Sequence, residues 1–61
     1  MVKYKRGPMI EDIMTLIFCM EHGDFLYHGT HCFPPGQWRD KSIRQLKDYI
    51  KKGLVFMAEV S

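Results

Sequence analysis

Two short segments of the chain carry residue types that bind zinc. They are Cys19-x-x-His22 and His28-x-x-His31-Cys32. Zinc takes four such ligands in a tetrahedral arrangement, so the two pairs together could supply one site. The spacing is not that of a standard zinc finger, and Cys19 lies in the most apolar stretch of the chain, where a buried free thiol is common. We therefore predict no metal site, and the candidate ligands for one are Cys19, His22, His28 and His31.

The sequence contains no recognisable catalytic motif. It has no glycine-rich phosphate loop, no His-Glu-x-x-His and no serine or cysteine nucleophile in a known frame. Cys32 follows His31 directly in the sequence. A nucleophile and its base must meet in space, so this adjacency does not indicate a catalytic pair. A chain of 61 residues also leaves little room for a pocket that excludes water. We predict that the protein is not an enzyme and uses no cofactor.

The strongest candidate for function is a basic surface near the C-terminus. Apolar residues recur there at the three- and four-residue spacing of one helix face, namely Ile43, Leu46, Tyr49 and Ile50. The other face carries Lys41, Arg44, Lys47, Lys51 and Lys52. Such groups bind phosphates, and Arg44 and Gln45 can reach base edges if the helix enters a major groove. Asp48 lies in the same face and would repel phosphate, so a merely solvated face is the alternative.

Local signals define both ends of this helix. Asp40 is a possible N-cap, and Ser42-x-x-Gln45 is a possible capping box. Gly53 marks the end, because a glycine there can take the left-handed conformation. A strand over residues 54–60 is expected to follow without a loop.

The first 22 residues divide into a basic lead and an apolar helix. Residues 1–7 carry Lys3, Lys5 and Arg6 and form a solvated tail, an arm that contacts phosphates, or a short edge strand. Gly7-Pro8 is expected to open a helix that ends near His22, since proline suits the first helical position.

This first helix is more apolar than so small a protein can easily cover. Either strands cover it or part of it forms a homodimer interface, and we expect a homodimer. The predicted interface residues are Leu16, Phe18 and Met20, together with the loop aromatics Phe33 and Trp38. For the two loop aromatics, the alternative role is to fold the loop over the core.

The remaining segments predict an α+β fold. Residues 25–28 are expected to form a strand that pairs antiparallel with residues 54–60. Between the strand and the second helix, Pro34-Pro35-Gly36 is expected to exclude helix and strand. We predict the order helix, strand, loop, helix, strand, with two antiparallel strands, both helices packed on one face, and residues 8–61 as a single domain.

Charge is distributed unevenly along the chain, although the formal net charge is only +2. Basic segments at the start and at residues 39–52 flank an acidic segment at residues 11–24. The basic segments could converge on one polyanion-binding face, or pair with the acidic segment of a neighbouring chain. With no apolar run near 18 residues, no signal-peptide pattern and two cysteines, we expect a soluble, cytoplasmic protein with reduced thiols and no membrane contact.

The stretch SIRQLKDYIKKGLV resembles the recognition helix and following strand of winged-helix DNA-binding domains. The resemblance covers residues 42–55 mainly. It implies that Lys41, Arg44, Gln45 and Lys47 face DNA while Ile43, Leu46 and Ile50 hold the helix to the core. The chain departs from that family because HCFPPGQW stands where another helix precedes the recognition helix, and because it ends too early for a hairpin wing.

The chain is also similar in general character to the small regulatory and accessory proteins of temperate bacteriophages. We therefore predict a small regulatory protein, of phage origin, that binds DNA through the second helix with the basic lead assisting. The alternative is an interaction module that modulates a protein partner through the apolar first helix or the aromatic Pro-Pro-Gly loop.

Overall fold

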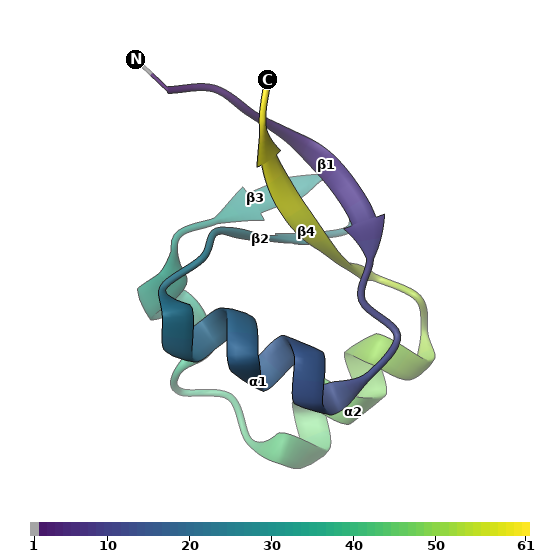
Figure 1. Ribbon diagram of the computed structural model, residues 1–61. Helices are drawn as coiled ribbons and strands as arrows, with labels where there is room; N and C mark the ends of the chain where they lie inside the picture. The colour runs from purple at the N-terminus through teal and green to yellow at the C-terminus, as the bar shows by residue number, and fades with distance from the viewer. Residues whose placement is uncertain (1) are drawn as a thin grey trace.

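A computed structural model describes residues 2–61 and confirms the α+β class, with two α-helices and one four-stranded antiparallel sheet (Figure 1). The elements in chain order are β1 (Tyr4–Met9), α1 (Ile13–His22), β2 (Leu26–His28), β3 (His31–Phe33), the 3₁₀ helix η1 (Pro35–Trp38), α2 (Ile43–Lys51) and β4 (Val55–Val60). Both α-helices lie on the same side of the sheet (Figure 1). The predicted number of strands, two, was too low, because β1 and β3 also join the sheet.

The sheet has the strand order β1-β4-β2-β3 and is antiparallel throughout. The predicted pairing of the first expected strand with the last is confirmed, with Leu26 opposite Met57 and His28 opposite Val55. The last strand therefore lies inside the sheet, between β1 and β2. Because a two-stranded ribbon is marginal in water, the two additional strands explain how so short a chain supports a sheet.

The expected helix start at Gly7-Pro8 is wrong, because these residues belong to β1. Of the alternatives for the N-terminal segment, the short edge strand is the one that forms. The register changes between Arg6 and Met9, which is a bulge in the edge strand. Proline is tolerated at such a bulge because it has no amide hydrogen to donate to the ladder. A Cβ at Gly7 would lie 2.8 Å from Glu59 Cγ, so a larger residue there would require the exposed Glu59 side chain to rotate away.

Helix α1 begins at Ile13, five residues after Pro8, and its N-cap is Asp12. The Asp12 carboxylate accepts a hydrogen bond from the Met14 amide at 3.3 Å, as an N-cap side chain does. Gly23 ends the helix with φ of 77°, and the amide of Asp24 donates to the Cys19 carbonyl. The expected end near His22 is confirmed.

The segment expected to be irregular contains a strand and a 3₁₀ helix. Gly29, with φ of 67°, and Thr30 form a two-residue turn that joins β2 to β3, so that His28 lies opposite His31. Pro35 then stands in the first turn of η1, where its missing amide hydrogen costs nothing. The exclusion of regular structure by the Pro-Pro-Gly run was therefore wrong for this short element.

Helix α2 has both predicted ends. Ser42 and Gln45 form a capping box, with the Gln45 amide donating to Ser42 Oγ at 3.2 Å and the Ser42 amide donating to Gln45 Oε1 at 3.1 Å. At the other end Gly53 has φ of 70°, and the Leu54 amide donates to the Tyr49 carbonyl at 3.2 Å. This is the Schellman arrangement expected of a glycine after the last turn.

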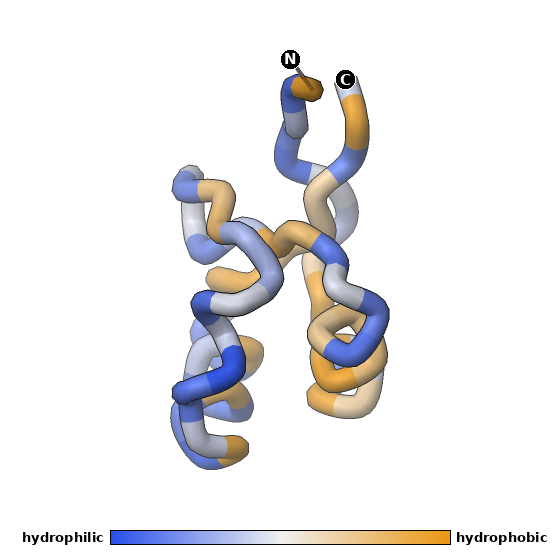
Figure 2. The backbone as a smooth tube through the Cα atoms, turned by 90° about the vertical axis from the view of Figure 1, so that its left-hand side faces the viewer, coloured by the Kyte–Doolittle hydropathy of each residue, from blue (hydrophilic) through white to orange (hydrophobic). Residues whose placement is uncertain are grey.

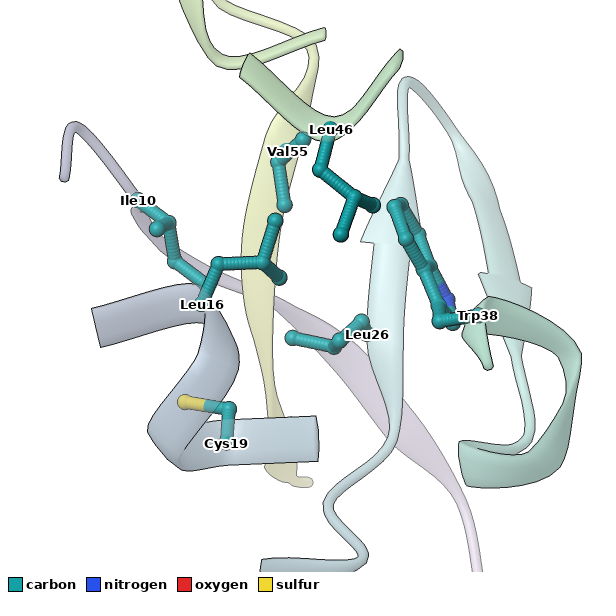
Figure 3. Packing of buried hydrophobic residues seen from close by; sticks show 7 residues of the cluster. All are labelled: Ile10, Leu16, Cys19, Leu26, Trp38, Leu46 and Val55. Atoms are coloured by element: carbon teal, nitrogen blue, oxygen red, sulfur yellow. The ribbon is translucent and has the colours of Figure 1, made fainter. Parts of the chain in front are cut away.

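Seven buried residues form the core between the helices and the sheet (Figure 3). They come from nearly every part of the fold and are Ile10, Leu16, Cys19, Leu26, Trp38, Leu46 and Val55. Leu16 and Trp38, two of the predicted interface residues, are covered by the protein's own chain. Neither side chain is therefore available to a partner in this fold.

Candidate nucleic-acid interface

The outward face of α2 gathers most of the predicted basic residues. Its exposed side chains are Arg44, Gln45, Lys47, Asp48 and Lys51. The opposite side of the helix faces the core through buried Leu46 and through partly buried Tyr49 and Ile50. Packing thus fixes the rotation of the helix about its own axis. That rotation points the cations Arg44, Lys47 and Lys51 to solvent.

The one acidic residue on this face is paired. Asp48 Oδ2 lies 3.0 Å from Lys52 Nζ, one helical turn further along the chain. An exposed pair of this kind contributes little to folding stability. It does place a cation against the carboxylate, so the repulsion of phosphate expected from Asp48 is reduced. Arg44, Lys47 and Lys51 then remain as uncompensated positive charges around Gln45.

Lys41 is engaged elsewhere. It precedes the first turn of α2, and its Nζ lies 6.0 Å from the ring centre of Trp38 and 5.9 Å from that of Tyr49. An ammonium at this distance is attracted by the face of an aromatic ring. The sequence placed Lys41 with the other lysines, but the structure places it against an aromatic cluster.

The basic N-terminal lead does not join the α2 surface. Lys3 and Lys5 are exposed at the end of the molecule where both termini lie, whereas the helices lie at the other end (Figures 1 and 2). The molecule measures 34 × 20 × 16 Å along its principal axes. The Arg6 guanidinium lies 4.4 Å from the centre of the Phe56 ring, so it is held against the sheet. The two basic segments therefore do not converge on one face.

Helix α1 is mostly hydrophobic along its length, in contrast to α2 (Figure 2), and its outward side carries three apolar residues together with Thr15 and Glu21. Met14 is 66% exposed and Phe18, one turn later, is 58% exposed, with partly buried Ile17 beside them. The His22 ring stacks on Phe18 with ring centres 4.3 Å apart. Of the predicted interface residues on this helix, Phe18 is exposed, whereas Met20 is partly buried against the core.

An aromatic cluster at η1 was missed by the sequence analysis. Trp38 is its centre, with the rings of His28, Phe33 and Tyr49 at centre-to-centre distances of 6.1, 6.3 and 6.1 Å, each nearly perpendicular to the indole. Phe33 and Trp38 fold the loop over the core, which was the alternative role for these residues. His28 and Tyr49 come from β2 and α2, and no local signal connects them to the loop.

The candidate metal ligands do not gather at one site, although His28 and His31 lie opposite each other in the β2–β3 hairpin. Cys19 is in the core, His22 stacks on Phe18, and His28 faces the aromatic cluster. Within residues 2–61, no three histidine, cysteine or acidic residues come together in a group that could hold a metal ion. Burial raises the pKa of the Cys19 thiol, and nearby Asp24 raises it further. Cys32 is exposed.

The chain matches no family model, no curated protein and no solved structure. In the part of the chain that the structure describes, neither helix has the length and apolar character needed to cross a membrane.

Proposed function

We propose that the protein binds double-stranded DNA through the outward face of α2. The observation that carries this proposal is the exposed set of Arg44, Lys47 and Lys51 around Gln45, with the only acid on the face paired to Lys52. Clustered lysine and arginine side chains on one face displace counterions from the phosphate backbone, which supplies most of the affinity for non-specific DNA.

The dimensions of α2 suit a major groove. An α-helix with its side chains is about 10–12 Å across, and the major groove of B-DNA is about 12 Å wide, so a helix of this kind fits the groove. The helix is held by a capping box at its start, by a Schellman motif at its end and by Leu46 in the core. Side chains on its outward face are therefore presented from a fixed element.

The residues on this face have different roles in the proposal. Arg44 and Gln45 stand in the first turn of α2, and first-turn residues of recognition helices contact base edges. Arginine pairs with guanine, so Arg44 is the base-reading residue, whereas Gln45 Oε1 accepts a hydrogen bond from the Ser42 amide in the capping box. Lys47 and Lys51 lie further along the helix and contact phosphates, which sets the orientation without reading sequence. We infer that the protein acts by occupying DNA, which is a regulatory role.

The test is a charge reversal with a control of equal charge. We expect Arg44→Glu with Lys47→Glu to lower affinity for duplex DNA by about a hundredfold, since each contact contributes about 1–3 kcal/mol. Lys3→Glu with Lys5→Glu makes the same change in net charge at the opposite end of the molecule. Fluorescence anisotropy measures binding, and circular dichroism checks folding. If both pairs weaken binding equally, net charge rather than α2 is responsible, and the proposal fails.

A second candidate function is protein interaction through the outward face of α1, favoured by the exposure of Met14 and Phe18. We propose a second copy of the chain as its occupant. Exposed acidic residues flank the apolar stripe, namely Glu11, Asp12, Glu21 and Asp24. Two such faces repel each other until salt screens the charges, so the dimer fraction should rise with salt and Phe18→Glu should remove it. A monomer at every salt and protein concentration would contradict this.

A further inference from the structure

A small pocket lies where the β2–β3 hairpin, η1 and the start of α2 meet. Its volume is about 50 Å³, and its lining residues are His28, Phe33, Gln37, Trp38 and Lys41. A single water molecule needs about 10–15 Å³ by this kind of measure. The pocket therefore holds a group of a few non-hydrogen atoms, and most of its wall is aromatic.

Two of the lining residues carry buried nitrogen atoms. Within residues 2–61, neither His28 Nε2 nor Trp38 Nε1 has a hydrogen-bond partner. Trp38 is 1% exposed, and Figure 3 shows its indole nitrogen on the side of the ring away from Leu26 and Leu46. A buried donor without an acceptor costs about 1–3 kcal/mol, so native proteins seldom leave one. An indole N–H can only donate, and the missing partner must therefore be an acceptor.

The charge of the pocket is positive. The Lys41 ammonium lies over the Trp38 and Tyr49 rings, and none of the five lining residues is acidic. Gln37 adds an amide that can donate. One cation with neutral donors fits a ligand with a single negative charge. A phosphate dianion, by contrast, usually needs several cations or a row of backbone amides.

We propose that this pocket binds a carboxylate group. A carboxylate is planar, so it fits between flat aromatic walls. Its two oxygens accept from the Trp38 indole and from Lys41, and its substituent points to solvent past exposed Gln37. Both unpaired nitrogens are covered in the present arrangement, so binding includes a rotation of the Gln37 or Lys41 side chain. Such rotations are fast, on the order of picoseconds to nanoseconds for exposed residues.

The chain offers a direct probe, because Trp38 is its only tryptophan. The indole N–H gives one isolated signal in a ¹⁵N-labelled sample. We expect this signal to move downfield and to saturate when sodium acetate is added at constant ionic strength. Sodium chloride at the same ionic strength should leave it in place. The carboxylate could come from an acidic side chain of a peptide or from a free small acid, and an aspartate with capped amino and α-carboxyl groups distinguishes the two. Tighter binding of this compound than of acetate points to an acidic peptide. Weaker binding points to a free small acid.

Two variants separate binding from folding. Lys41→Met keeps an apolar stem over the rings but removes the charge, and we expect it to weaken acetate binding at least about tenfold, as expected for a charge-assisted hydrogen bond worth roughly 1.5–3 kcal/mol. Lys47→Met removes an exposed lysine outside the pocket and should leave acetate binding unchanged. A linear response to acetate, an equal response to chloride, or the same acetate affinity in both variants would overturn the proposal. No response to either carboxylate would also overturn it, because water alone would then satisfy the indole.

Discussion

Helices α1 and α2 share one core but present different side chains to solvent, and α1 is the more hydrophobic of the two along its length (Figure 2). Each buries a leucine, Leu16 in α1 and Leu46 in α2, and each ends at a glycine with positive φ. Outward, α1 shows Met14 and Phe18, whereas α2 shows three unpaired cations. The core thus determines one face of each helix and leaves the other free, so function is best sought where the two outward faces differ.

The largest expected effect separates the inward and outward faces of α1. Leu16→Ala should lower the free energy of unfolding by about 2–5 kcal/mol, because it leaves a cavity in a core of seven buried residues. Phe18→Ala, two residues further along and on the exposed side, should change it by no more than about 0.5 kcal/mol. Urea denaturation at low protein concentration measures both. Equal losses would mean that the outward face of α1 is covered.

Both helices end at a glycine with positive φ, and the same substitution tests each end. Gly53→Ala should cost about 1–2 kcal/mol, since its φ of 70° is unfavourable for any residue with a Cβ. Gly23→Ala, with φ of 77°, should cost a similar amount. Gly36→Ala is the control, because that glycine has neither positive φ nor a neighbour within 4 Å of an added Cβ. Thermal denaturation that ranks Gly36→Ala with the other two would contradict the Schellman assignment.

The helix starts differ, and this difference predicts unequal losses. Ser42→Ala should cost about 1 kcal/mol, because a capping box with reciprocal bonds is removed. Asp12→Ala removes a single bond of 3.3 Å and should cost less, although still at least about 0.5 kcal/mol. Chemical denaturation of the two variants gives the order. A larger loss for Asp12→Ala would show that the cap of α1 is the stronger one.

The smallest effect is a pH dependence that belongs to α1 alone. Burial raises the pKa of the Cys19 thiol above its ordinary value of 9.0, with nearby Asp24 adding to the shift. The unfolded chain then loses this proton at a lower pH than the folded one, so folding stability should fall as pH rises above about 9. Denaturation between pH 8 and 10 should show a shallower fall in Cys19→Ala. An unchanged slope in that variant would remove Cys19 as the cause.

The structure of α2 could be predicted from its own residues, whereas that of the N-terminal segment could not. Ser42, Gln45 and Gly53 act within a few residues of the helix ends, so their hydrogen bonds follow from local sequence. Gly7-Pro8 is compatible with a helix start and with a bulge in an edge strand. Only the pairing with β4, more than 45 residues away in the chain, decides between them.

The same distinction applies to the candidate sites. The outward face of α2 follows from helical periodicity, and four of the six residues predicted for it line it, namely Arg44, Gln45, Lys47 and Lys51. Lys52 pairs with Asp48. Lys41 lies over the aromatic cluster because η1 places Trp38 beneath it. That cluster combines residues of β2, β3, η1 and α2, so no sequence pattern of short period could indicate it.

The most direct test of the DNA-binding proposal is the salt dependence of binding to a random-sequence duplex. The two residues assigned to phosphates, Lys47 and Lys51, predict a slope of log affinity against log salt of about −1.8, since each phosphate contact contributes about −0.9. Lys51→Gln should reduce the magnitude of the slope by about 1, and Lys3→Gln should leave it unchanged. No binding at low salt, or a slope that falls equally in both variants, would contradict a DNA-binding role for the outward face of α2.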